Sequence, residues 1–83
     1  MSEPYANLDT FEGTASADLA ITFSRRSRKI ILTNDSGSVS LGFKFHADET
    51  YATLKPNESV SLDIWVTGMI LNGSSEYRLW SFG

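Results

Sequence analysis

Apolar and polar residues alternate with a period of two along most of this chain. The clearest case is the segment 38–46, SVSLGFKFH, in which Val39, Leu41, Phe43 and Phe45 alternate with small or polar residues. Successive side chains of a β-strand point to opposite faces of its sheet. The pattern therefore predicts a strand with one buried face.

Other segments show the same alternation, and the residues expected on their inner faces are Leu19, Ile21 and Phe23, then Val60, Leu62 and Ile64, then Tyr77 and Leu79. The short segments 51–54 and 69–72 are also expected to be strands. In 28–34, Ile30 and Leu32 share one face and Ile31 takes the other, which predicts a strand covered on both sides over part of its length. No window carries the i, i+3, i+4, i+7 apolar stripe of an amphipathic helix.

Turn-forming residues separate these segments. In KPNES (55–59), Pro56 presets φ for a turn and Asn57 tolerates the left-handed region. The Asn72-Gly73 pair is a hairpin signal, and 35–38 also reads as a hairpin turn. Such turns and strand spacing predict an all-β fold of about six or seven strands, either a small antiparallel β-sandwich (jelly-roll-like) or a small barrel.

Residues 1–16, MSEPYANLDTFEGTAS, alternate poorly and include Gly13 and several small polar residues. We expect either an extended N-terminal arm before a sandwich domain at 17–83, or an ordinary first strand or turn. For an arm, removal of residues 1–14 is expected to leave a folded body that attaches more weakly. The apolar residues that could hold an arm against a surface are Tyr5, Leu8 and Phe11.

Composition and charge narrow the function classes. The 83 residues fit one domain, and without cysteine neither disulfides nor thiolate metal sites can form. The net charge is −3, whereas a protein that neutralises many phosphates is expected to be basic. No apolar run has the length of a membrane span, and the first residues show no secretory signal. We expect a cytoplasmic product without nucleic-acid or membrane partners, supported by oligomerisation or docking.

A basic cluster, Arg25, Arg26, Arg28 and Lys29, immediately precedes the apolar run at 30–32. It could be the solvated start of a strand, it could form ion pairs with an acidic protein surface, or it could bind phosphate. Nucleic-acid binding would call for aromatic residues interleaved on the same face, and the only aromatic residue nearby is Phe23, which fits the core pattern. A role in protein architecture is favoured, and the residues expected at a polar contact are Arg25, Arg26 and Arg28.

Catalytic and metal-binding residues are sparse. The one histidine, His46, lies beside Asp48 and Glu49, but a general base also needs a nucleophile in register, and no G-x-S-x-G motif occurs. The segment 35–38 is rich in oxygen ligands but lacks the spaced acids and terminal glutamate of an EF-hand. We therefore expect no enzyme activity, no metal and no cofactor.

Aromatic residues on the outward positions of the predicted strands point to binding. Trp65 breaks the inward pattern of its strand, and Trp80 shares a face with Phe82. A second sheet could cover them, sugar rings could stack on Trp65, Trp80 and Tyr51, or a protein neighbour could bury them. Tryptophan and arginine are common hot spots of protein interfaces, so Trp65 and Trp80 are candidate partner-binding residues.

The order of motifs from about residue 21 onward resembles that of small virion proteins of tailed bacteriophages. These motifs are SR, IILTND, FKF, LKPNE, LDI, MIL and YRLW, at 27–28, 30–35, 43–45, 54–58, 62–64, 69–71 and 77–80. The first sixteen residues match none of them.

The resemblance implies a non-enzymatic structural component of a virion. It implies a capsid decoration or cement protein that docks on the major capsid protein and on copies of itself, with a position at the neck, tail or fibre as the alternative. Repeated copies would strengthen weak contacts through avidity. A carbohydrate-binding module is the expectation from a different functional class.

Overall fold

The computed structural model describes residues 7–83, and every regular element in that range is a β-strand. The strands are β1 (Leu8–Thr14), β2 (Leu19–Thr22), β3 (Lys29–Asn34), β4 (Leu41–Lys44), β5 (Ala52–Leu54), β6 (Ser59–Leu62), β7 (Gly68–Asn72) and β8 (Glu76–Phe82). Tyr5 lies outside the described residues.

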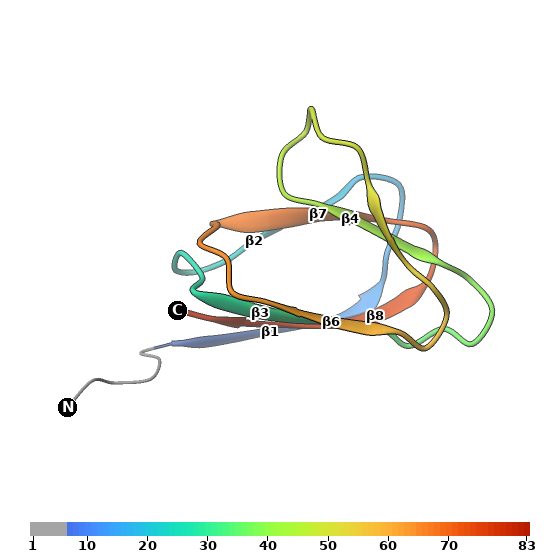
Figure 1. Cartoon of the computed structure of the whole chain (residues 1–83), viewed down its shortest axis with the longest axis horizontal. Helices are drawn as coiled ribbons and strands as arrows, with labels where there is room; N and C mark the ends of the chain where they lie inside the picture. Colours follow the sequence, from blue (N-terminus) through green and yellow to red (C-terminus); the bar gives the residue numbers. More distant parts are fainter. Residues whose placement is uncertain (1–6) are drawn as a thin grey trace.

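Two four-stranded sheets form the two layers of the molecule (Figure 1). The first sheet has the order β1-β8-β3-β6 and the second the order β2-β7-β4-β5, and all neighbouring strands are antiparallel. The expected antiparallel sandwich is thus confirmed.

The strands pair from the two ends of the chain toward its middle: β1 pairs with β8, β2 with β7, β3 with β6 and β4 with β5. The chain is therefore folded in half at the connection between β4 and β5, and the resulting double strand wraps into two sheets. This is the arrangement of an eight-stranded jelly roll. The structure has eight strands in the described range instead of the expected six or seven, and the additional strand is β1, which lies in the leader.

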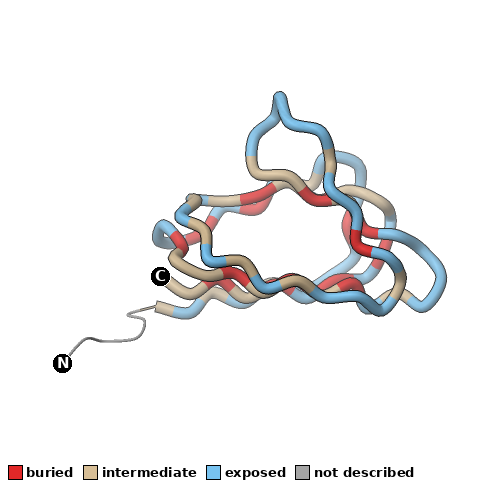
Figure 2. Tube along the Cα trace, viewed as in Figure 1, coloured by how far each residue is buried: buried red, intermediate tan, exposed pale blue. Residues whose placement is uncertain are grey.

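The core lies between the two sheets, where the buried positions of facing strands meet (Figure 2). In β3, Ile30 and Leu32 are fully buried, as their alternation predicted, and Ile31 is half-buried on the opposite face. No second layer covers that opposite face within residues 7–83, so the prediction of a strand covered on both sides was wrong. Ile31 is instead flanked in its own sheet by Trp80.

The leader contributes a strand to the sandwich. Over its whole length β1 pairs with β8, from Leu8 opposite Phe82 to Thr14 opposite Glu76. Of the two interpretations of the leader, the structure has the first strand at 8–14. Deletion of residues 1–14 would therefore remove an edge strand from the first sheet rather than a detachable arm.

Most connections cross from one sheet to the other, and only β4 and β5 form a hairpin of consecutive strands. The predicted turns occur at Asn57, with φ of 64°, and at Gly73, with φ of 123°. The hairpin predictions at 35–38 and 72–73 were wrong, because each turn joins strands of different sheets. A Cβ atom at Gly73 would lie 2.5 Å from the carbonyl oxygen of Ser40, so this crossing requires glycine.

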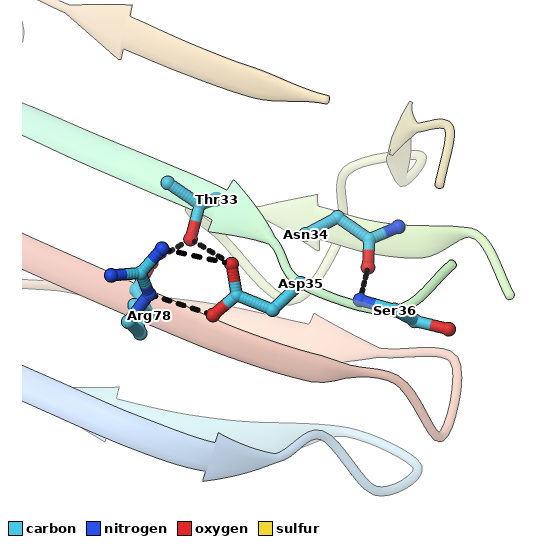
Figure 3. A network of polar contacts seen from close by, with 5 residues as sticks. All are labelled: Thr33, Asn34, Asp35, Ser36 and Arg78. Carbon is cyan, nitrogen blue, oxygen red and sulfur yellow. Dashed lines mark hydrogen bonds and ion pairs between the residues drawn. The ribbon is translucent and has the colours of Figure 1, made fainter. Parts of the chain in front are cut away.

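Buried Asn34 joins two of these crossings, β3–β4 and β5–β6, at one end of the sandwich. Its amide nitrogen donates to the carbonyl oxygens of Val39 (2.8 Å), Leu54 (3.1 Å) and Lys55 (3.2 Å), and its side-chain oxygen accepts the Ser36 N–H (3.0 Å; Figure 3). Asn34 thus links these connections to each other at this end of the molecule.

Candidate functional site

Two connections meet at the end of the sandwich opposite Asn34, and buried Ser27 holds them together. The Ser27 hydroxyl donates to the carbonyl oxygen of Ile64 (2.7 Å) and accepts the N–H of Val66 (3.2 Å). The Ser27 N–H donates to the carbonyl oxygen of Val66 (2.7 Å). The serine thus fixes the basic β2–β3 connection against the β6–β7 connection.

This contact brings the predicted basic and aromatic residues together. The guanidinium carbon of Arg26 lies 4.8 Å from the centre of the Trp65 ring, and Trp65 is 62% exposed. Arg25 is also exposed, whereas Arg28 is half-buried and its N–H donates to the carbonyl oxygen of Phe82 (2.7 Å). Arg25, Arg26 and Trp65 are therefore accessible at one end of the molecule.

A shallow groove of about 380 Å³ lies beside Trp65 on the second sheet. Its lining includes Arg26, His46, Gly68 and Ile70. The carboxylate of Glu49 accepts the backbone N–H groups of Phe45 (2.8 Å) and His46 (2.9 Å), and these bonds lower its pKa. Glu49 thus fixes the turn, and the histidine backbone with it.

The outer face of the first sheet carries the second group of predicted residues. We use this name for the outward side chains of β1, β8 and β3. Strand pairing places Leu8, Phe82 and Lys29 in one row and Thr10, Trp80 and Ile31 in the next. Leu8 is 54% exposed, while Trp80, Phe82 and Ile31 are half-buried. Four apolar side chains are therefore neighbours on a face that the second sheet does not cover.

Phe11 belongs to the core margin rather than to an exposed contact. It lies opposite Leu79, its ring centre is 5.8 Å from that of Phe23, and it packs on the core. Since β1 is an edge strand, Phe11 stays only half-buried. Its expected role in holding an arm is replaced by a role in closing the open side of the sandwich.

The aromatic residues expected to form a sugar platform lie on separate surfaces. Trp80 is on the outer face of the first sheet, and Trp65 is on the β6–β7 connection. Tyr51 precedes β5 of the second sheet, where its ring lies 4.3 Å from the Lys44 ammonium and its hydroxyl donates to the Asp18 carboxylate. That hydrogen bond raises the pKa of Tyr51. One flat platform made of all three rings is excluded.

The Asp35 side chain of the loop at 35–38 is engaged in hydrogen bonds with its neighbours. The Asp35 carboxylate accepts two hydrogen bonds from Arg78 (2.7 and 3.2 Å) and one from the Thr33 hydroxyl (3.0 Å; Figure 3). The pKa of Asp35 is lowered, and the hydrogen bond from Arg78 is the main cause. Among residues 7–83 no group of three or more histidine or acidic residues could hold a metal ion. The described range also contains no helix that could cross a membrane.

Sequence reasoning missed Ile31 as a member of the exposed face. The sequence did contain a signal for Ile31, the break in alternation at 30–32, but we interpreted it as burial on both sides of the strand.

No protein-family model, no curated protein and no solved structure matches this chain.

Proposed function

We propose that this protein is a non-enzymatic structural subunit of a bacteriophage virion. It docks on the major capsid protein through the outer face of the first sheet. The observation that carries the proposal is the adjacency of Leu8, Phe82, Trp80 and Ile31 on an uncovered face. The resemblance of the motif order to tailed-phage virion proteins supplies the setting, and the jelly roll is an architecture that viral capsid domains use.

The composition of this face suits a protein interface. Protein interfaces have an apolar centre enriched in aromatic residues and arginine, with a polar rim. Here the apolar rows are flanked by Lys29 at one end, and by Glu12 and Arg78 in the row beyond Thr10 and Trp80. The guanidinium carbon of Arg78 lies 5.3 Å from the Trp80 ring centre and holds the indole in place.

The basic β2–β3 connection adjoins the outer face of the first sheet. Gly83 follows Phe82 directly, and a Cβ atom at Gly83 would lie 3.3 Å from the Cβ of Arg25 and 3.0 Å from the carbonyl oxygen of Arg26. Arg25 and Arg26 therefore border the row that contains Leu8 and Phe82. Since the whole chain carries a net charge of −3, this positive margin is local. We infer that the docking surface on the capsid protein has an apolar centre and an acidic border.

The proposal is tested with virions of the phage that encodes the chain. Mass spectrometry of purified particles should detect the protein in many copies, and particles lacking it should bind the purified protein back in co-sedimentation. Leu8→Ser and Trp80→Ser should weaken this binding at least tenfold. Val39→Ser is the matched control, because Val39 is an aliphatic residue 39% exposed in the β3–β4 connection, outside the docking face.

Absence of the protein from purified particles would overturn the virion assignment. Equal binding by the Leu8→Ser, Trp80→Ser and Val39→Ser variants would overturn the docking face. A few copies on one particle axis, instead of many over the facets, would place the protein at the neck, tail or fibre.

Carbohydrate binding in the groove beside Trp65 is the second candidate function. The observation in its favour is a highly exposed indole next to a concave surface, with Thr22 and His46 as hydrogen-bonding groups in the lining. Arg26 covers one face of the ring, so a sugar would stack on the other. A glycan array should then show binding that Trp65→Ala abolishes and Trp80→Ala retains. An array without any bound glycan would remove this candidate.

A further inference from the structure

Strand β1 forms an open edge of the first sheet and has little of the protection that such edges usually carry. It is seven residues long, LDTFEGT, and has no proline, lysine or arginine; its charged residues are Asp9 and Glu12. Its register with β8 is one to one from Leu8 to Thr14, so no bulge turns it away. Natural proteins usually blunt an exposed edge strand with charge, proline or a bulge, because its free backbone groups can pair with another chain.

The hydrogen bonds just before the start of β1 show which of its backbone groups point to the open edge. Asn7 and Gly83 exchange both of their backbone hydrogen bonds (3.2 and 2.9 Å), so they form a hydrogen-bonded pair. In an antiparallel ladder such pairs alternate with pairs that are not hydrogen-bonded. The next hydrogen-bonded pairs are therefore those of Asp9, Phe11 and Gly13 with β8.

It follows that the N–H and C=O groups that point to the open edge belong to Leu8, Thr10, Glu12 and Thr14. Outside the strand ladder, no backbone hydrogen bond of these residues to another part of 7–83 is found. A strand laid along this edge would therefore meet donors and acceptors at every second residue.

We propose that β1 pairs antiparallel with β1 of a second copy of this chain, about a two-fold axis at Phe11. Leu8 then lies opposite Thr14 of the other copy, and Thr10 lies opposite Glu12. The first sheet continues across the axis into its copy, and both copies present the same surface, as a closed two-fold dimer requires. The inference does not depend on the proposed virion function, since it concerns the free protein.

The charges along β1 select this register. Of the axes that pair outward backbone groups, those at Thr10, Phe11 and Glu12 include at least five residues of β1. An axis at Glu12 would set two glutamates directly opposite each other, which is unfavourable. An axis at Thr10 would leave Thr14 without a partner inside β1. The axis at Phe11 uses the whole strand and sets neither acidic residue, Asp9 nor Glu12, opposite an acid.

The same register would cover the exposed part of Phe11. At the axis Phe11 lies opposite its own copy in a pair without hydrogen bonds, where the Cα atoms come within about 4.5 Å. Its ring points inward, toward Phe23. Pairing would therefore cover the side of Phe11 that the monomer leaves open and place two aromatic rings across the dimer axis, a favourable cross-strand pair.

The first experiment measures the dimer dissociation constant by sedimentation equilibrium of the purified full chain. Thr10 is exposed and faces Glu12 of the copy twice in each dimer. Thr10→Glu should therefore raise the Kd by about 2- to 30-fold, and Thr10→Lys should lower it by a similar factor. Thr53→Glu and Thr53→Lys make the same charge changes at an exposed residue of the second sheet, and both should leave the Kd nearly unchanged.

The second experiment uses the absence of cysteine in the chain. Phe11→Cys should give a covalent dimer on mild oxidation, because the two cysteine Cα atoms would fall near the range that a disulfide spans. Leu8→Cys is the control. The side chain at position 8 is more exposed than that of Phe11, but in this register the two cysteines of the dimer lie about 20 Å apart along the strands. A wild-type chain that stays monomeric at high concentration, equal shifts at positions 10 and 53, or cross-linking of the control as fast as Phe11→Cys would each overturn the proposal.

Discussion

The guanidinium of Arg26 lies over the indole of Trp65, with 4.8 Å between the guanidinium carbon and the ring centre. The two residues belong to different connections, β2–β3 and β6–β7, and buried Ser27 holds these connections together. The sequence suggested Arg26 for a polar contact and Trp65 for an apolar contact, and in the structure both residues belong to one surface.

Fluorescence of single-tryptophan variants tests this surface. The chain has two tryptophans, so Trp80→Phe leaves only Trp65, which is 62% exposed, and Trp65→Phe leaves only half-buried Trp80. Acrylamide should quench the Trp80→Phe protein more strongly. Adding Arg26→Ala to Trp80→Phe should increase quenching further, because one ring face loses its cover. An exposed cation–π contact contributes about 0.5–1 kcal/mol, so stability should fall by no more than that.

Equal quenching of the two single-tryptophan proteins would contradict the greater exposure of Trp65. A cooperative unfolding transition, measured for each variant by circular dichroism, provides the control that the fold is intact.

The period of two was sufficient to predict the strands whose inner faces are strongly apolar. Ile30 and Leu32, or Tyr77 and Leu79, are buried as alternation requires. Strand β1 was harder to recognise, because its inward positions are Asp9, Phe11 and Gly13, of which only one is apolar. Its place in the sheet is determined by the ladder with β8, and that partner lies at the far end of the chain.

The turns illustrate a different limit of sequence reasoning. Asn57 and Gly73 do adopt positive φ, as their residue types suggested. Turn chemistry determines the local backbone but not which sheet the next strand joins, so a crossing between sheets resembles a hairpin in the sequence. The meeting of Arg26 with Trp65 depends on those crossings and could not be derived from local pattern.

Asn34 should be among the polar residues most important for stability. Asn34→Ala leaves the carbonyl oxygens of Val39, Leu54 and Lys55 without their donor, and an unsatisfied buried group costs about 1–3 kcal/mol. We expect the free energy of unfolding in urea to fall by about 2–3 kcal/mol, since part of this end can admit water. Ser40→Ala, an exposed change in the same region, should alter it by less than about 0.5 kcal/mol. Similar losses for both variants would contradict the bridging role of Asn34.

Gly68 should tolerate no side chain. A Cβ atom there would lie 2.3 Å from the carbonyl oxygen of Ile21 in the neighbouring strand β2. Gly68→Ala must therefore push β2 away from β7, and overpacking of this kind costs about 1–3 kcal/mol. At Gly37 the nearest atom to an added Cβ is 4.0 Å away, so Gly37→Ala should change the melting temperature little. The idea fails if thermal unfolding shows the two alanine variants to be equally stable.

Acid should weaken the fold through Asp35. The Arg78 hydrogen bonds hold the pKa of Asp35 below its ordinary value of 3.8, so the carboxylate stabilises the folded state above that pH. This stabilisation is lost as the pH falls through the lower pKa of the folded state. Hydrogen bonds from Ser24 lower the pKa of Asp9 and add a loss in the same direction.

Asp35→Asn isolates the contribution of this ion pair. The side chains of Arg78 and Asp35 are 50% and 30% exposed, so solvent screening limits the contribution to about 0–1 kcal/mol. At pH 7 the variant should be less stable than the wild type by that amount in urea unfolding. Near pH 2.5 the difference should shrink, because protonation then removes the wild-type charge as well. A difference that grows on acidification would mean that Asp35 stabilises the fold in its protonated form, contrary to the sign derived from its contacts.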